Sequence, residues 1–324
     1  MKVLFLGNPA ILSPWHDDFV AAIGGRYPVE LYNPAAAMAE QFRGVEVVVD
    51  LGGAGANRTL IDAGAAAAVR LWQILGNGLD HVDVAYFLEK RVPLAHTPGL
   101  FCSTALAEHA LFLMLCFAKN FGAGQKNVRS KVFYKPVNDE LEGKTLGLIG
   151  LGASGRALAQ RAGSMGMRIM AIDIVAIPPA IRARLHVEFF GGLAQLDRLL
   201  AEADYLSLHT PLTAATRHLI DCRAFGLMKA TAVLINVARG GIVDEAALIE
   251  ALQSGRIRGA GLDVFAHEPL DPAHPLLHMD NVIATPHVAG ATWGTSRRRA
   301  QAAAANVARV AQGLPPLYQV TSVP

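Results

Sequence analysis

Three glycines in the middle of the chain have the spacing that binds the phosphates of a dinucleotide. They are Gly150, Gly152 and Gly155, arranged as G-x-G-x-x-G. In such a motif the first glycine permits a tight turn, the second lets the backbone approach the pyrophosphate, and the third lets helix and strand pack closely. The free N–H groups and the dipole of the following helix attract the phosphates. Alone the motif is weak evidence, because glycines fall at these offsets by chance.

The surroundings of the glycine motif strengthen it. A strand is predicted over Thr145–Ile149 and a helix over Arg156–Met165, and Asp173 ends the next strand 18 residues after Gly155. An acidic residue at this place accepts hydrogen bonds from both ribose hydroxyls and repels a 2′-phosphate. Apolar residues follow Asp173, where NADP sites usually have Arg or Lys. The sequence therefore favours NAD over NADP, and an ordinary strand–turn–helix unit without a nucleotide is the weaker alternative.

Composition and charge exclude several classes of protein. The chain has 324 residues, of which 52% are hydrophobic, and a net charge of +2. This length suggests two domains, and the small charge argues against a nucleic acid or an anionic membrane as partner. Cys102, Cys116 and Cys222 form no CxxC pair, so neither a disulfide framework nor a metal site is predicted. No apolar run reaches the ~20 residues of a membrane span or resembles a secretory signal, so a cytoplasmic protein is expected.

Two series of alternating strands and helices are predicted. Unbroken runs of β-branched and leucine residues between helical segments are typical of parallel sheets covered on both faces. A mostly apolar helix, Ser103–Lys119, and a polar segment, Asn120–Glu142, separate the two series. The predicted strands of the first series are Val3–Leu6, Val29–Tyr32, Val45–Leu51 and Leu71–Leu75, and those of the second are Thr145–Ile149, Arg168–Ile172, Tyr205–Leu208, Ala232–Asn236, Gly261–Val264 and Val282–Ala284.

Three later segments carry the most specific motifs. They are residues 236–244 (Asn-Val-Ala-Arg-Gly-Gly-Ile-Val-Asp), 261–269 (Gly-Leu-Asp-Val-Phe-Ala-His-Glu-Pro) and 285–290 (Thr-Pro-His-Val-Ala-Gly). With the glycine motif, the turn at 75–83 and the junction at 209–213, they resemble the D-isomer-specific 2-hydroxyacid dehydrogenase family in order and spacing. The resemblance extends along nearly the whole chain.

The resemblance implies a catalytic triad of Arg239, Glu268 and His287. The fixed fork of a guanidinium suits a substrate that has a carboxylate beside a ketone. Reduction of the ketone leaves an alkoxide that needs a proton, and imidazole is suited to donate it. A carboxylate beside the histidine would orient the ring and favour imidazolium. Each residue taken singly is more often structural, and the triad rests on their joint occurrence.

The resemblance also assigns ligand contacts. No metal is implied. The backbone N–H groups of Gly52 and Gly53, with Asn77, Gly78 and Arg239, would bind the substrate carboxylate, and substrate is expected between two domains. The residues expected to contact the cofactor are Gly150, Gly152, Ser154, Gly155, Arg156, Asp173, His209, Thr210, Pro211, Val237, Ala238, Asp263, His287 and Gly290, with Asp263 and the Val237 carbonyl on the nicotinamide amide.

Two doubly wound α/β domains with parallel sheets are predicted. By resemblance, a flavodoxin-like substrate domain combines residues 1–97 with 291–324, because the terminal helix of the family returns to the first domain. A Rossmann domain for NAD occupies residues 98–290 between them. The resemblance further implies a homodimer joined through the cofactor domains, with Asn120–Glu142 as a contributing arm.

Three functions remain open at this level. The first is an NAD-dependent D-2-hydroxyacid dehydrogenase that reduces a 2-keto acid such as glyoxylate, hydroxypyruvate or phenylpyruvate. The second is an NAD-sensing binding protein, like the transcriptional corepressors of the family, which the lack of a polar low-complexity tail disfavours. The third is a paralogue that binds NAD without turnover, which the intact triad disfavours. Trp293 could shape a pocket or a subunit contact, or it could pack in the core.

Overall fold

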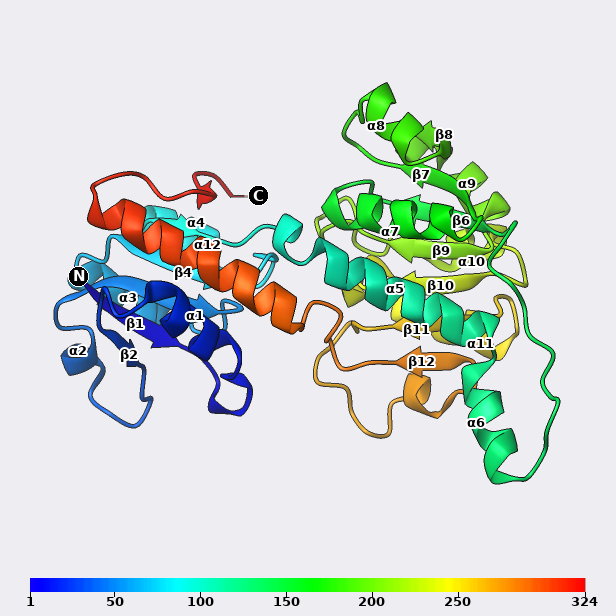
Figure 1. The fold of residues 1–324 in the computed structure, drawn as a ribbon, viewed down its shortest axis with the longest axis horizontal. Helices are drawn as coiled ribbons and strands as arrows, with labels where there is room; N and C mark the ends of the chain where they lie inside the picture. Colours follow the sequence, from blue (N-terminus) through cyan, green and yellow to red (C-terminus); the bar gives the residue numbers. More distant parts are fainter. Residues whose placement is uncertain (324) are drawn as a thin grey trace. The chain divides into compact units, whose positions relative to one another are not determined.

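The protein, described here for residues 1–323 from a computed structural model, divides into two compact units (Figure 1). The first unit comprises Met1–Phe101 and the chain from Thr292 onward, and the second comprises Cys102–Ala291. The boundaries predicted from the sequence lie at 97/98 and 290/291. Each unit contains its own sheet.

The first unit contains a six-stranded sheet in the order β13-β5-β4-β3-β1-β2. Strands β1 to β5 are parallel in the order typical of flavodoxin-like folds, and β13 adds an antiparallel edge. The elements are β1 (Lys2–Leu6), η1 (Pro9–Ile11), α1 (Trp15–Ile23), β2 (Val29–Leu31), α2 (Met38–Gln41), β3 (Val45–Leu51), α3 (Arg58–Ala66), β4 (Leu71–Leu75), α4 (Val84–Glu89), β5 (Leu94–Ala95), η2 (Gly99–Phe101), α12 (Trp293–Ala311) and β13 (Gln319–Val320).

The second unit contains a seven-stranded parallel sheet in the order β12-β11-β10-β9-β6-β7-β8. Its first six strands in chain order follow the Rossmann arrangement, so the predicted fold class is confirmed for both units. The elements are α5 (Ser103–Ala118), α6 (Phe121–Arg129), β6 (Thr145–Ile149), α7 (Ala153–Ser164), β7 (Arg168–Ile172), α8 (Pro179–Arg184), β8 (Val187–Gly191), η3 (Leu193–Gln195), α9 (Leu196–Glu202), β9 (Tyr205–Leu208), α10 (Cys222–Leu227), β10 (Val233–Asn236), η4 (Gly240–Ile242), α11 (Glu245–Gln253), β11 (Gly259–Leu262), η5 (Pro275–His278) and β12 (Val282–Ala284).

Helix α12 returns to the first unit because one of its faces is apolar. Ala303 and Val307 of this helix are fully buried in the core that covers β1 and β3. Asn306 adds a polar anchor, since its amide donates to the Gln73 side chain at 2.7 Å and to the Leu317 carbonyl at 2.9 Å. These contacts fix the C-terminal segment on the first sheet.

The structure corrects several details of the sequence prediction. Strand β11 spans Gly259–Leu262, two residues earlier than predicted, and the polar segment 120–142 contains helix α6. Strands β5, β8 and β13 were not predicted. Trp293 does not pack in the core, because it is 65% exposed at the start of α12. Within residues 1–323, no helix combines the length and the apolar character that a membrane crossing requires.

Candidate active site

The glycine motif forms the turn between β6 and α7. Gly150 has a φ of +96°, and a Cβ atom on it would lie 2.5 Å from the His209 carbonyl oxygen. A Cβ on Gly155 would lie 2.1 Å from the Gly150 oxygen, so both positions exclude any side chain. A Cβ on Gly152 would meet no atom within 4 Å. The loop is therefore tight at its base and open at Gly152, directly before the helix, where a phosphate group fits.

His209 links the start of α7, beside the glycine loop, to strand β9 through its two ring nitrogens. One ring nitrogen, Nδ1, lies 3.0 Å from Ser154 Oγ in α7, and Nε2 lies 3.0 Å from Ser207 Oγ in β9. Burial lowers the pKa of His209 to about 4, so the ring is neutral near pH 7. A neutral ring has one donor and one acceptor nitrogen, and it can therefore join two hydroxyl groups. His209 is followed by Thr210 and Pro211 at the same edge of the sheet.

Asp173, at the end of β7, contacts the glycine loop directly. Its Oδ2 accepts a hydrogen bond from the Leu151 N–H at 2.7 Å, and its Oδ1 accepts one from the Val175 N–H at 2.9 Å. The carboxylate therefore stands at the junction of β6 and β7, as a ribose-binding residue would. Ile174 beside it is 90% exposed. Arg156 lies in the first turn of α7, where its N–H donates to the Gly152 carbonyl at 3.0 Å.

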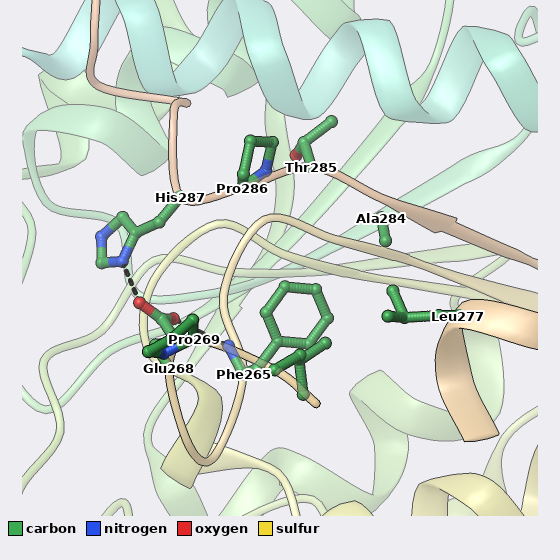
Figure 2. Close-up of a pocket in the computed structure, with 9 residues that line it drawn as sticks. Phe265, Glu268, Pro269, Leu277, Ala284, Thr285, Pro286 and His287 are labelled. Atoms are coloured by element: carbon green, nitrogen blue, oxygen red, sulfur yellow. Dashed lines mark hydrogen bonds and ion pairs between the residues drawn. The ribbon is translucent and has the colours of Figure 1, made fainter. Parts of the chain in front are cut away.

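His287 and Glu268 form a hydrogen-bonded pair (Figure 2). The Nδ1 atom of His287 lies 2.7 Å from Oε2 of Glu268, and the other carboxylate oxygen, Oε1, accepts the Phe265 N–H at 2.9 Å. Burial raises the pKa of Glu268, but hydrogen bonds from His287 and Phe265 and the charges of His287 and Arg239 outweigh it, so the pKa lies below its usual value. Glu268 is therefore ionised at neutral pH.

The turn that carries His287 is held by Asp263. The Asp263 side chain is 1% exposed, and it accepts the Thr285 hydroxyl at 2.6 Å and the N–H groups of Val288 and Ala289 at 2.9 and 2.8 Å. The Asp263 carbonyl accepts the His287 N–H at 2.9 Å. His287 has a φ of +54°, which is uncommon outside glycine, and these bonds stabilise that backbone conformation.

His109 in α5 extends this hydrogen-bonded network. Its Nε2 lies 2.9 Å from Thr285 Oγ1, and burial lowers its pKa although the Asp263 charge acts in the opposite direction. Because the Thr285 hydroxyl donates its proton to Asp263, it accepts from the His109 Nε2–H. Gly290, at the end of the turn, packs against Leu106 of the same helix.

Arg239 follows β10 in a turn that Asn236 organises. The Asn236 amide donates to the Arg239 carbonyl at 2.9 Å and accepts from the Ala238 N–H at 3.1 Å. The guanidinium donates to the Ala238 carbonyl at 2.8 Å, and Val237 is buried beneath the turn. The Arg239 charge lowers the pKa of Glu268, so it acts on the same site as the Glu268–His287 pair.

A cavity of about 480 Å³ lies beside the Glu268–His287 pair. Figure 2 shows its largely apolar wall and the second ring nitrogen of His287 turned away from Glu268. The lining residues are Phe265, Glu268, Pro269, Leu270, Leu277, Ala284, Thr285, Pro286 and His287.

The remaining predicted residues lie in the first unit. Gly52 and Gly53 follow β3 with φ values of +73° and +82°, and Asn77 and Gly78 follow β4. The two turns are neighbours, because a Cβ on Gly76 would lie 3.3 Å from the Gly52 Cα. Parallel strands end at the same edge of a sheet, where open α/β proteins bind ligands.

Sequence reasoning missed several residues that shape this site. Asn236 and Thr285 belong to the motifs of the family resemblance but had no assigned role, and His109 was not among the predicted site residues. Each acts through a hydrogen bond to another part of the site, and such bonds leave no spacing signal in the sequence. Only Asn236 could have been recognised from the sequence, because a polar residue at the end of a buried strand needs a hydrogen-bond partner. In the described residues, no group of three or more His, Cys, Asp or Glu could hold a metal ion.

Comparison with known proteins identifies the family. Residues 111–289 match the model described as "D-isomer specific 2-hydroxyacid dehydrogenase, NAD binding domain". The chain is 41% identical over 246 residues to a glyoxylate reductase of Thermofilum pendens. The aligned residues make up 74% of this chain and 71% of the relative. It is 40% identical over 227 residues to a hydroxypyruvate reductase of Thermotoga maritima, covering 69% and 71%.

A solved structure agrees over the full length. The apo-structure of D-lactate dehydrogenase from Escherichia coli matches with a TM-score of 0.84 and 25% identity, covering 99% of this chain and 100% of that one. The family model lies within the second unit, which contains the glycine loop and the Glu268–His287 pair. The chain belongs to the D-isomer-specific 2-hydroxyacid dehydrogenase family, and it is an NAD-binding enzyme that acts on 2-keto and 2-hydroxy acids.

Proposed function

We propose that His287 is the general acid and base of this dehydrogenase. The observation that carries the proposal is the 2.7 Å hydrogen bond between His287 Nδ1 and Glu268, which leaves Nε2 for the reacting oxygen. In reduction, Nε2–H donates a proton to the oxygen on C2 of the keto acid, and in oxidation Nε2 accepts it. NADH, when bound, supplies the hydride.

Glu268 and Arg239 complete the proposed triad. The ionised Glu268 carboxylate orients the imidazole and stabilises its protonated form, because an opposite charge at this distance favours imidazolium. Arg239 binds the substrate carboxylate and polarises the carbonyl with its planar fork. We propose that the N–H groups of Gly52 and Gly53, with Asn77 and Gly78, are the substrate-binding groups of the first unit.

The residues of the glycine loop fit a dinucleotide. The open space at Gly152 admits the pyrophosphate, which the N–H groups of α7, Ser154 and Arg156 bind, and Asp173 accepts the ribose hydroxyls. The negative charge of Asp173 makes NAD the preferred cofactor. Asp263 already accepts three hydrogen bonds from the His287 turn, so few acceptor positions remain for a nicotinamide amide. The other proposed contacts are Gly150, Gly155, His209, Thr210, Pro211, Val237, Ala238, His287 and Gly290.

We propose small 2-keto acids, with glyoxylate and hydroxypyruvate first, as substrates. The names of the two relatives at 40% and 41% identity support this choice. The test is NADH oxidation by the purified protein against glyoxylate, hydroxypyruvate, pyruvate and phenylpyruvate, with NADPH in parallel. Turnover of glyoxylate or hydroxypyruvate with NADH supports the proposal. Turnover of phenylpyruvate alone contradicts the substrate class, and preference for NADPH contradicts the role of Asp173.

We also propose a homodimer to which the segment 120–142 contributes. This segment exposes a set of large apolar side chains, and such patches mark interaction sites on soluble proteins. The expected result is a particle of twice the 34.4 kDa chain mass in light scattering, and Phe133→Ser with Tyr134→Ser should shift it toward the monomer. A wild-type monomer would contradict the proposal. The exposed residues are Phe121, Val128, Val132, Phe133, Tyr134 and Val137.

A further inference from the structure

A second glutamate–histidine pair holds the loop that carries Glu268. The N–H groups of Phe265 and Ala266 are consecutive, and each donates to a different carboxylate. The Phe265 N–H donates to Glu268 at 2.9 Å, and the Ala266 N–H donates to Oε2 of Glu245 at 3.1 Å. The other oxygen of Glu245 lies 3.2 Å from Nε2 of His274. Glu245 is the first residue of α11, so this pair ties the loop to a helix.

The hydrogen bonds of His274 define its neutral tautomer. Its Nδ1 accepts the Leu276 N–H at 3.4 Å, so the ring proton is on Nε2 and points to Glu245. Glu245 and His274 are each about one-fifth exposed at the side chain, which limits competition from water.

The held loop also contacts the residue after Arg239. A Cβ on Gly240 would lie 1.9 Å from the Phe265 carbonyl carbon and 2.4 Å from the Ala266 nitrogen. The peptide between Phe265 and Ala266 is thus in direct backbone contact with Gly240. A shift of this peptide would move the Phe265 N–H that orients Glu268, and it would also press on the turn that carries Arg239.

We propose that Glu245, supported by His274, is a positioning residue that holds the 265–268 loop so that Glu268 meets Nδ1 of His287. Among the described residues, the side chain of Glu245 bonds the Ala266 N–H and lies beside His274, so it acts on Glu268 through the loop backbone. The inference rests on the proposed roles of Glu268 and His287. Removing a positioning contact costs rate because about 1 Å of misplacement can lower a rate by about 10²-fold.

The test is a double-mutant cycle on the full-length enzyme. We expect Glu245→Ala to lower kcat by about tenfold or more with the NADH Kd unchanged, and Glu245→Gln, which keeps one acceptor oxygen, to lie between this variant and wild type. In the Glu268→Ala background the same Glu245→Ala change should alter kcat by less than about twofold, because its effect passes through Glu268. Equal losses in both backgrounds would overturn the proposal. The matched control is Glu250→Ala, which removes an exposed carboxylate from the same helix and should leave kcat unchanged.

A spectroscopic measurement tests this inference independently of the proposed function. In the free protein the bond to Glu268 places the neutral ring proton of His287 on Nδ1, whereas an unbonded histidine prefers Nε2–H. Nitrogen chemical shifts of ¹⁵N-histidine-labelled protein at alkaline pH report this choice. Glu245→Ala and, less strongly, Glu245→Gln should move His287 toward Nε2–H, and an unchanged tautomer in both would overturn the proposal. Failure of wild type to reduce any keto acid would overturn the proposed function alone.

Discussion

At the scale of single residues, Glu268 depends on two partners at once. One carboxylate oxygen accepts the Phe265 N–H and the other bonds His287, so both oxygens of the side chain are held in place. Its lowered pKa follows from these contacts and from Arg239. The family resemblance predicts the three members of the proposed triad, but the sequence does not predict the hydrogen bonds that hold their loops in place. Asn236, Thr285, His109 and Glu245 supply those bonds from separate parts of the sequence.

Glu268→Gln removes the negative charge of this side chain and keeps nearly the same size and shape. The amide keeps one acceptor oxygen for His287 but no longer stabilises imidazolium. We expect kcat for keto acid reduction to fall by about 10- to 100-fold, because the pair loses the attraction between opposite charges. The measurement is steady-state kinetics across pH, with NADH affinity as the control. A variant with wild-type kcat at every pH would show that the charge is not required.

At the scale of elements, β11 shows why propensity misplaced a strand. Its sequence, Gly-Ala-Gly-Leu, has only one residue that favours strands, so propensity does not define where the strand begins, and the predicted strand started two residues late. A Cβ on Gly259 would lie 2.5 Å from a ring carbon of Phe117, and α5 therefore packs on the strand only if glycine stands there. The packing of α5 on this strand therefore outweighs the low strand propensity of its residues. The other nine predicted strands agree with the structure to within one residue, and most of them are buried apolar runs.

A substitution of Asp173, in the βαβ unit around the glycine loop, tests the preference for NADH over NADPH. Asp173→Asn keeps an oxygen for the Leu151 N–H and removes the charge that faces a 2′-phosphate. We expect kcat/KM with NADPH to rise by about tenfold and that with NADH to fall, because like-charge repulsion is removed while ribose binding weakens. Both cofactors are assayed on the same keto acid. Unchanged discrimination between NADH and NADPH would assign the preference to other residues.

At the scale of the whole molecule, the chain leaves the first unit at Phe101 and returns to it at Thr292. Hydrophobic periodicity predicted two α/β series but not this return, which came from the family resemblance. The reason is that an apolar helix face does not by itself identify the sheet that it covers. Only its packing against α1 and the anchor at Asn306 specify the first unit.

The two-unit structure allows the stability of the first unit to be measured by itself. Trp15, Trp72 and Trp293 are the only tryptophans in the sequence, and all lie in that unit. Asp50 is fully buried there, where it accepts the Gly55 N–H and the Trp72 indole N–H, both at 3.1 Å. Burial raises the pKa of Asp50 to about 6.

The stability difference between Asp50→Asn and wild type should therefore depend on pH, even though the Asn amide can accept only one of the two N–H bonds. Between the unfolded pKa of about 4 and the folded value, the folded state holds a proton that the unfolded state has lost, so wild-type stability falls as pH rises. The variant cannot ionise, so its stability relative to wild type should rise with pH, mainly between pH 4 and 6, by at most about 3 kcal/mol in total. Tryptophan fluorescence during urea unfolding measures this. A stability difference that does not change with pH would contradict the prediction.

The most direct test of the central claim compares His287→Ala with wild type on the keto acid that wild type reduces best. The measurement is kcat with saturating NADH, with the NADH Kd determined on the same samples. The account predicts a loss of about 10²- to 10⁴-fold in kcat, the usual contribution of a general acid, and a much smaller change in the NADH Kd, because His287 is one of many proposed cofactor contacts. A variant that keeps more than about a tenth of wild-type kcat would show that another group supplies the proton.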